Sequence, residues 1–357
     1  MNDNPLQSKG RNDLLKKALL TVFFVLITVA TIWVVTTQSR DFSAGGFWQF
    51  LSSANPLWLI AAILAASGFI FFEAASLHEI CRGFGHRQKF RRSLVYSASD
   101  IYFSAITPSA TGGQPASGYF MAHDGIPVPV TTVALLLNLI MYTMSIVVIG
   151  VVCFVFRPSL FLHFSVLSKW LIIIGCVMQI LMAVFFLLLL RHEKIVLKIS
   201  RVFLSLLHRL HLVRHAKRKS EKLARMAEEF RVCAGMLKGR RWILVISFLF
   251  NFLQRFSLIM VPVFAYLAVG GSPARAFDVF VVQSMVILGS NSVPIPGAVG
   301  VADYLLIDGF SALVPNAVNM ELFSRGLSFY FSVAISAVYT FICYLLLVKK
   351  MKRNVLK

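Results

Sequence analysis

Apolar residues form six long runs, and most charged residues stand in the short segments between them. The runs cover residues 18–37, 57–77, 128–156, 170–190, 242–269 and 326–348. A helix crosses the hydrocarbon core of a bilayer with about 20 apolar residues. We therefore predict an all-α integral membrane protein with about six full transmembrane helices.

Two further apolar stretches, 94–122 and 279–314, are interrupted by turn-forming residues. The first is broken by Thr107-Pro-Ser-Ala-Thr-Gly-Gly-Gln-Pro115, and the second by Ser292-Val-Pro-Ile-Pro-Gly-Ala-Val-Gly300. Proline removes a backbone donor and glycine allows a positive φ, so both sequences are typical of the end of a helix. Each stretch therefore predicts two half-helices joined by a break.

The positions of lysine and arginine indicate which loops face the cytoplasm. These residues cluster before the first run, after the second run, throughout 191–241 and after the last run, whereas the other connections hold very few. Cytoplasmic loops of membrane proteins carry the excess of Lys and Arg. We therefore expect a cytoplasmic N-terminal segment, 1–17, and a cytoplasmic tail, 349–357.

A count of crossings leaves each interrupted stretch beginning and ending on one side of the membrane. Stretch 94–122 stays on the cytoplasmic side and stretch 279–314 stays outside, so we interpret each as a re-entrant hairpin. Residues 18–156 then form a first repeat of span, span, hairpin and span. The second repeat starts in 157–190, continues through 242–348 and has the opposite orientation. Inverted repeats with broken helices are common in secondary transporters. The alternative is that each stretch is a kinked ordinary span or an interfacial loop.

The basic segment 191–241 separates the two repeats. It holds 15 Lys and Arg against four acidic residues. Two sets of apolar residues recur there at helical spacing: Ile199, Val202, Phe203, Leu206 and Leu210, then Leu223, Met226, Phe230, Cys233 and Leu237. We predict two amphipathic helices on the inner leaflet. Their charges are either ordinary cytoplasmic-loop charges or a surface that recruits anionic lipid headgroups.

The composition excludes most soluble classes of protein. The chain of 357 residues is 58% hydrophobic and 14% charged, whereas soluble domains carry about 25% charged residues. The net charge of +20 follows the loop pattern of a membrane protein, so we expect no nucleic-acid partner. The five cysteines lack CxxC spacing and predict neither a disulfide nor a zinc site.

The motifs of common cofactors are also missing from the sequence. His208, His211 and His215 share one helical face, but the Lys and Arg around them oppose a bound cation. No Walker A, dinucleotide or metalloprotease motif is present, so we expect no metal, no cofactor and no catalytic residue.

The two breaks hold the candidate substrate-binding residues. In and before the first break these are Asp100, Thr107, Ser109, Thr111, Gly112, Gly113 and Gln114. In and after the second they are Asn291, Ser292, Pro294, Pro296, Gly297, Gly300 and Asp303. The N-terminus of a half-helix directs free N–H groups into its surroundings, which favours an anion such as a phosphate. The alternative is that the glycines and prolines only make tight turns.

Ionisable residues inside apolar runs are further candidates because they are costly in a bilayer. Arg255 lies well inside its run, and we hypothesise that it pairs with Asp303. Such a pair is either a structural clip or a site for a headgroup and a proton. Glu73 and Asp308 lie nearer the ends of their segments, where we expect them to reach the membrane interface.

The two breaks together resemble the transmembrane family of lysylphosphatidylglycerol synthases and flippases. The first motif continues with Tyr119 and Asp124-Gly-Ile126, and the second is followed by the acidic Asp303. The resemblance covers about residues 10–350. The sequence departs from the family pattern at Ala298, where a second glycine is usual, and at Asp303, where a glutamate is usual. Bifunctional relatives carry an aminoacyltransferase domain after this region, and this chain ends at Lys357, so we expect no transferase activity from it.

The residues and the resemblance together predict a flippase-like transporter of lipids or lipid-linked molecules in the bacterial cytoplasmic membrane. The resemblance implies an anionic or aminoacylated phospholipid, or a glycolipid, as substrate, and a separate lipid-modifying enzyme as a further partner. Three alternatives remain open. They are a membrane subunit of a lipid-modifying system, a small-solute transporter or channel, and a scaffold without transport.

Overall fold

The computed structural model describes Trp48, residues 51–107, 110–191, 232, 235 and 239–355. The chain divides into two compact units, Met1–Gln49 and Phe50–Lys357, and the fold below is that of the second. The first predicted span, 18–37, and both predicted amphipathic helices lie outside the described residues. In the part that is described, the secondary structure is helical throughout.

Within the described residues, five helices are long and apolar enough to cross a membrane. They are α3 (Pro56–Gly83), α6 (Val128–Phe156), α8 (Val166–Arg191), α11 (Arg241–Ala268) and the continuous helix over Ala317–Leu346. Each coincides with one of the predicted apolar runs. A helix of 28 residues, such as α3, is about 42 Å long, which exceeds the hydrocarbon thickness of about 30 Å. The chain is therefore a multi-pass membrane protein.

The last spanning helix begins earlier than the sequence predicted. It starts with α14 (Ala317–Arg325), continues through a six-residue π-helix, η4 (Gly326–Phe331), and ends as α15 (Ser332–Val355). The prediction began at residue 326 because Glu321 and Arg325 interrupt the apolar pattern. Both side chains are buried inside the protein, so they do not prevent α14 from joining the span.

Both interrupted stretches form two helices with a break between them, as predicted. The first consists of α4 (Phe90–Ile106) and α5 (Gly113–His123), and the second of α12 (Ala276–Ser290) and α13 (Val301–Ser311). With 11 to 17 residues, these helices are about 16–25 Å long and fall short of a full crossing. The two helices of each pair pack against each other. Their re-entrant placement in a membrane remains a prediction.

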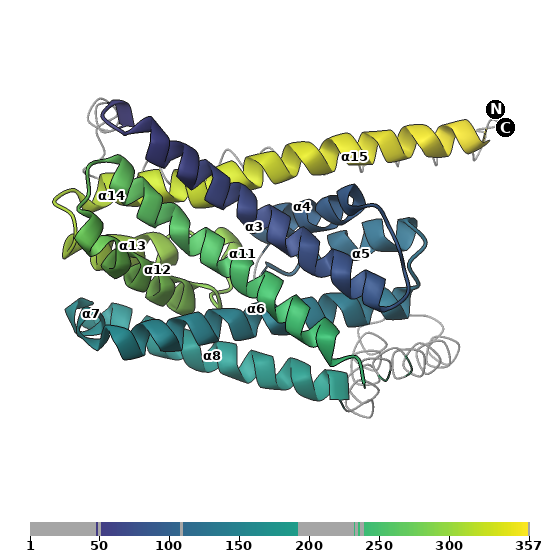
Figure 1. Ribbon diagram of the computed structural model, residues 1–357, viewed down its shortest axis with the longest axis horizontal. Helices are drawn as coiled ribbons and strands as arrows, with labels where there is room; N and C mark the ends of the chain where they lie inside the picture. Colours follow the sequence, from purple (N-terminus) through teal and green to yellow (C-terminus); the bar gives the residue numbers. More distant parts are fainter. Residues whose placement is uncertain are drawn as a thin grey trace, which may run out of the picture. The chain divides into compact units, whose positions relative to one another are not determined.

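The bundle is built around the contact between α3 and α11, which lie side by side in Figure 1. Close approach of these helices requires small residues. A Cβ added to Gly83 would come 2.4 Å from the Ile243 Cδ1 atom, and one added to Gly68 would come 3.0 Å from the Ser257 Oγ atom. Small residues are common where transmembrane helices meet, because there packing replaces the hydrophobic effect.

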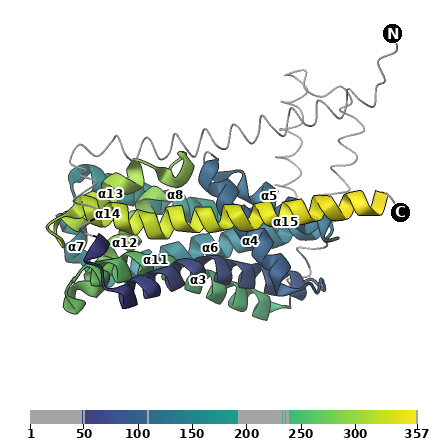
Figure 2. The ribbon, with the colours of Figure 1, turned by 90° about the horizontal axis from the view of Figure 1, so that it is seen from above.

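The two helix pairs lie on different sides of this central contact. Helix α4 packs against α3 and α15, whereas α12 packs against α6, α8 and α11. Figure 2 shows α15 running along one face of the bundle, over α4. Short helices complete the described chain: α7 (Pro158–His163), η2 (Pro273–Arg275) and η3 (Pro296–Ala298).

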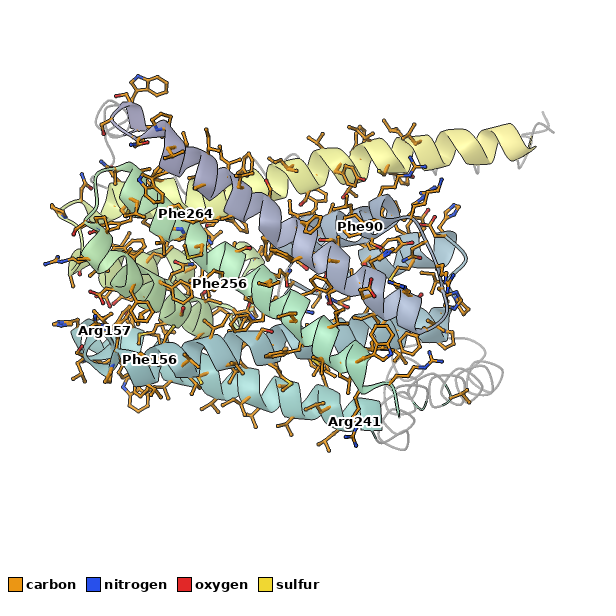
Figure 3. The ribbon with its side chains drawn as sticks, in the orientation of Figure 1. Phe90, Phe156, Arg157, Arg241, Phe256 and Phe264 are labelled. Carbon is orange, nitrogen blue, oxygen red and sulfur yellow. The ribbon has the colours of Figure 1, made fainter. Side chains whose placement is uncertain are left out.

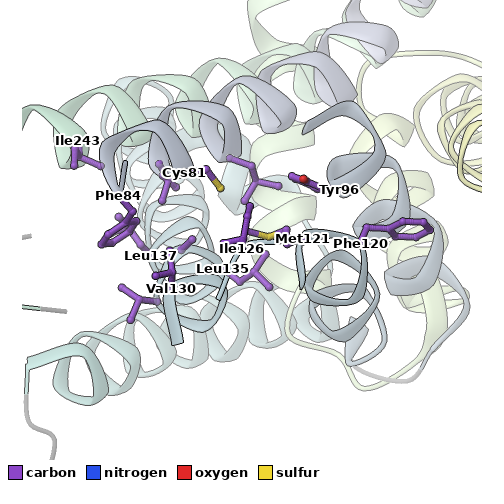
Figure 4. Close-up of a cluster of buried hydrophobic side chains, with 14 of the residues drawn as sticks. Cys81, Phe84, Tyr96, Phe120, Met121, Ile126, Val130, Leu135, Leu137 and Ile243 are labelled. Atoms are coloured by element: carbon purple, nitrogen blue, oxygen red, sulfur yellow. The ribbon is translucent and has the colours of Figure 1, made fainter. Parts of the chain in front are cut away.

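An apolar core fills the space between α3, α4, α5 and α6 (Figure 4). Its fully buried members include Leu77, Ile80, Tyr96, Met121 and Leu137. The outer surface is apolar as well, and α8 in particular exposes Trp170, Ile174, Leu181 and Val184. A surface of this kind is solvated by lipid rather than by water.

Candidate functional site

Asp100 connects the two helices of the first pair. Its carboxyl group accepts hydrogen bonds from Gln114 Nε2 at 3.2 Å and from Ser104 Oγ at 3.3 Å. Gly113 allows this approach, because a Cβ there would lie 2.0 Å from both Asp100 Oδ1 and Ser104 Oγ. Two residues predicted for the site, Asp100 and Gln114, are thus in direct contact.

Hydrogen bonds within the chain close the first break itself. Thr107 Oγ1 donates to the Phe103 carbonyl at 2.6 Å and accepts from the Gly112 amide at 2.8 Å. Thr111 is exposed, and Ser109 lies outside the described residues. Thr107 and Gly112 therefore hold the shape of the break.

Glu73 occupies the contact between α3, α4 and α11. Only 4% of the residue is exposed. Its Oε2 atom accepts hydrogen bonds from Gln254 Nε2 at 3.0 Å and from Ser97 Oγ at 3.2 Å. The expectation that Glu73 reaches the membrane interface is wrong, because α3 continues ten residues beyond it to Gly83. Ser97 stands one turn before Asp100 on α4, so its bond to Glu73 makes the two acids neighbours.

Arg255 lies beside these two acids in α11, and 5% of the residue is exposed. Its guanidinium carbon is 3.8 Å from the centre of the Tyr142 ring and 4.9 Å from that of Phe69. Glu73 and Asp100 are the acidic residues that interact with it electrostatically. Among the described residues, however, no carboxylate oxygen lies within the 4.0 Å of an ion pair. Its Nε atom is buried and lacks a hydrogen-bond partner there.

Tyr142 extends this set of polar residues to the second break. Its hydroxyl donates to Asn291 Oδ1 at 2.5 Å, and Asn291 follows the last residue of α12. Asn291 is exposed, whereas Arg255 is buried. We call the connected set the Arg255 cluster: Glu73, Asp100, Gln114, Tyr142, Gln254, Arg255 and Asn291. The cluster contains Asp100 and Gln114 from the first helix pair and Asn291 from the second. Helix α4 also contacts η3 in the second break.

The hypothesised pair of Arg255 and Asp303 is wrong. Asp303 Oδ1 instead lies 2.7 Å from Arg325 Nε in α14, and Asp303 Oδ2 accepts from the Gly300 amide at 2.8 Å. Arg325 also donates to the Gly297 carbonyl at 3.2 Å and lies over the Phe329 ring. Asp303 therefore caps the start of α13, and its contact with Arg325 attaches the second break to α14. The sequence reading passed over Arg325 because it placed this residue before the last span.

Other predicted residues of the second break contribute to its shape. Gly297 has a φ of 60°, and a Cβ added there would come 2.4 Å from Phe329 Cζ. Gly300 has a φ of 85° at the start of α13. Pro294 is exposed and Pro296 begins η3. Ser292 has a buried hydroxyl without a hydrogen-bond partner in the described part of the chain.

A neutral polar cluster that sequence reasoning missed lies one turn from Glu73. Ser76 Oγ donates to Asn138 Oδ1 at 2.6 Å, and Asn251 Nδ2 donates to the same oxygen at 2.9 Å. These contacts join α3, α6 and α11. The available signal was an asparagine in the middle of two apolar runs, Asn138 in 128–156 and Asn251 in 242–269. The three groups mainly bond one another, so we assign them to helix packing.

Asp308 also serves the fold. Its Oδ2 atom accepts from the Ser165 amide at 2.9 Å, immediately before α8 begins at Val166. It thus supplies an acceptor for a free N–H group at a helix start. In the described part of the chain, no group of three His, Cys, Asp or Glu residues is placed to hold a metal ion. The three histidines at 208, 211 and 215 fall outside that part.

An apolar groove of about 430 Å³ runs between α6, α11 and α12 and is open on one side. Its lining residues are Ile149, Val152, Cys153, Phe156, Phe252, Phe256, Phe277 and Phe280. Arg157 and Asp278 form an ion pair of 3.4 Å that joins α6 to α12 beside it. In Figure 3, Phe156 and Arg157 mark one end of α6 and Phe256 lies further along the bundle. Phe256 directly follows Arg255, so the groove reaches the level of Arg255 along α11.

These features define a multi-pass helical membrane protein with two broken helix pairs and a polar cluster between them. The family model described as "Lysylphosphatidylglycerol synthase TM region" matches residues 20–336. The chain belongs to this family, as the two motifs predicted.

A second comparison gives a more distant likeness. A "UPF0104 membrane protein" of Archaeoglobus fulgidus (strain ATCC 49558 / DSM 4304 / JCM 9628 / NBRC 100126 / VC-16) is 30% identical over 81 residues. The match covers 23% of this chain and 25% of that relative, so the chain spans only a quarter of its length. No solved structure matches significantly.

Proposed function

We propose that the protein is a flippase-like transporter that moves a phospholipid or a related lipid-linked molecule across the bacterial cytoplasmic membrane. The observation that carries this proposal is the position of Arg255, a buried cation between two broken helix pairs. The headgroup phosphodiester would bind to Arg255, and the acyl chains would remain in the lipid. An aminoacylated lipid would be supplied by a separate lipid-modifying enzyme.

The chemistry of Arg255 supports a phosphodiester as the ligand. An ionised side chain at the bilayer centre costs about 2.5–3.5 kcal/mol on insertion scales, so such residues are kept for function or paired closely. Arg255 stacks on Tyr142, and its Nε atom lacks a partner among the described groups. The planar guanidinium group can donate two parallel hydrogen bonds to a phosphate. Asn291, at the exposed end of the Arg255 cluster, offers a path to this group.

The packing of the helices supports the inverted repeat of the proposed transporter. In this scheme α3 corresponds to α11, α4 to α12, α5 to α13 and α6 to the last span. The two central members, α3 and α11, pack on each other, and α4 packs on α15 as α12 packs on α6. A two-fold relation between the halves predicts such matched contacts. With the span 18–37 added, the charge pattern gives six crossings and two cytoplasmic termini.

The Phe-lined groove favours a lipid over a small polar solute. Its lining is apolar throughout, and it is open on one side rather than enclosed. A solute pore would need polar groups along its length, whereas an acyl chain is solvated by apolar side chains. The groove reaches the level of Arg255 along α11, so one lipid could place its tail in the groove and its headgroup at the cluster.

A reconstituted flipping assay tests this proposal. Proteoliposomes would carry fluorescent phosphatidylglycerol, lysyl-phosphatidylglycerol, phosphatidylethanolamine or a glycolipid, and a membrane-impermeant quencher would report transfer between leaflets. We expect the wild type to accelerate the transfer of at least one phospholipid between the leaflets. Arg255→Gln and Arg255→Lys should each lower that rate at least tenfold, since one removes the charge and the other removes the planar fork.

The matched control is Arg82→Gln, which removes a cation from the exposed end of α3. It should flip lipid at the wild-type rate. The melting temperature in detergent distinguishes a loss of activity from a loss of folding. If Arg255→Gln does not fold, Arg255→Lys tests whether Arg255 is needed for flipping. A wild type that moves no lipid of the panel, or a folded Arg255→Lys protein with full activity, would overturn the proposal.

A further inference from the structure

Two buried carboxyl groups accompany the single buried cation of the Arg255 cluster. Glu73 is 4% exposed and Asp100 is 8% exposed. Ser97, which lies one turn before Asp100 on α4, donates to Glu73 Oε2 at 3.2 Å, so the two carboxyl groups are neighbours. Two buried carboxyl groups that share a site do not both ionise, so one of them carries a proton. The cluster without substrate then contains one carboxylic acid, one carboxylate and one guanidinium, with no net charge.

A bound phosphodiester would change this balance. It adds one negative charge beside Arg255, and an uncompensated charge in a buried site is costly. A second proton on the Glu73 and Asp100 pair restores neutrality. We propose that this carboxyl pair is a proton-binding site that takes up one proton from water with each phosphodiester that binds to Arg255. The inference rests on the proposed function and names the ion that accompanies the lipid.

Gln254 supplies an independent observation at the same place. Its Nε2 atom donates to Glu73, while its Oε1 atom is buried without a donor among the described residues. The residue is 1% exposed. A protonated Glu73 can donate to this oxygen while accepting from Nε2, as a carboxylic acid and an amide commonly pair. The orphaned acceptor therefore points to a proton on Glu73.

In the part of the chain that the structure describes, few charged or titratable groups face the pair. Helix α11 contributes Arg255 and α6 contributes Tyr142, whose ring lies against Arg255. Helix α5 contributes only the neutral Gln114. His78, further along α3, is instead engaged with Ser93. Proton uptake on lipid binding should therefore report on Glu73 and Asp100.

The sign of the effect follows from linkage. If the lipid-bound form holds one more proton than the free form, lower pH favours the bound form. Where the linkage is complete, affinity should fall about tenfold for each rise of one pH unit. Protons released with the lipid on the opposite side would then couple its movement to the pH gradient.

Titration calorimetry with short-chain phosphatidylglycerol would count these protons. The measurement is repeated in two buffers of different ionisation enthalpy, and the difference gives the protons taken up. We expect up to one proton per lipid for the wild type and an affinity that weakens with pH. The variant Glu73→Gln/Asp100→Asn should bind at least as tightly, take up no proton and show no pH dependence. Glu79→Gln, elsewhere on α3, should behave as the wild type.

The outcomes separate the two proposals. A wild type that neither binds nor flips phospholipid overturns the proposed function and this inference with it. A wild type that binds and flips lipid with no proton uptake overturns this inference alone, as does uptake that persists in the double variant. If the double variant fails to fold, the wild-type proton count and its pH dependence still decide the question.

Discussion

The Arg325 Nε atom lies 2.7 Å from Asp303 Oδ1, and this contact joins α14 to the first turn of α13. The two side chains are 10% and 19% exposed. Arg325 also binds the Gly297 carbonyl, so one guanidinium group holds both sides of the second break. The pair has the geometry of a structural clip.

Removing one member of this ion pair should destabilise the protein more than removing both members. Arg325→Leu leaves Asp303 without its partner, and loss of one member of a buried pair costs about 3–5 kcal/mol. Partial exposure places the expected loss at the lower end of that range. Asp303→Leu/Arg325→Leu removes both charges and should recover most of the melting temperature in detergent. The double variant should also retain lipid flipping. A double variant as unstable as the single one would show that the two residues do not act as a pair.

Gly113→Ala should separate the two helices of the first pair. The new Cβ would lie 2.0 Å from Asp100 Oδ1 and 2.6 Å from the Asp100 carbonyl oxygen. Overpacking of this kind costs about 1–3 kcal/mol, and it moves Gln114 away from Asp100. We expect a lower melting temperature and slower flipping.

Gly118→Ala is the matched control on the same helix. Its Cβ would meet Leu135 Cδ1 at an ordinary 3.4 Å, and alanine favours a helix over glycine by about 1 kcal/mol. Stability should be unchanged or higher. Equal losses in the two variants would indicate that α5 tolerates no added methyl group anywhere, and that the Asp100 contact is not special.

Much of the helical framework could be predicted from the sequence, because a bilayer demands long apolar runs and leaves few alternatives. The five described spans and both broken pairs follow from that demand. Glu73 was misplaced because the length of α3 beyond the apolar run depends on its packing. The contacts between side chains far apart in the sequence were harder still to predict. Tyr142 and Asn291 are 149 residues apart, and a tyrosine hydroxyl in an apolar run does not reveal whether it reaches a partner or the membrane interface.

The inverted repeat predicts that the two breaks face opposite sides of the membrane. Thr111 and Ile295 are both exposed and stand in the first and second break. Thr111→Cys and Ile295→Cys, each in a background with the five native cysteines replaced, would be treated with a membrane-impermeant thiol reagent in cells and in inverted vesicles. We expect Thr111→Cys to react from the cytoplasm and Ile295→Cys from outside. Reaction of both positions from one side would exclude the inverted arrangement.

The Phe-lined groove predicts dependence on the acyl chains of the substrate. Val152 lines the groove on α6 and is 46% exposed. Val152→Trp would fill part of its volume of about 430 Å³ at a position ten residues beyond Tyr142 on α6. If an acyl chain occupies the groove, flipping of long-chain phosphatidylglycerol should fall several-fold, whereas binding of a short-chain analogue to the Arg255 cluster should change little.

Val155→Trp provides the comparison for this variant. Val155 lies one turn away on α6, is 68% exposed and does not line the groove. The same indole group there would face lipid, so flipping should stay at the wild-type rate. The comparison separates the groove from the general effect of a tryptophan on the outer surface of α6. Equal flipping rates for Val152→Trp, Val155→Trp and the wild type would show that the tails travel elsewhere, and the Arg255 cluster alone would then have to account for lipid selection.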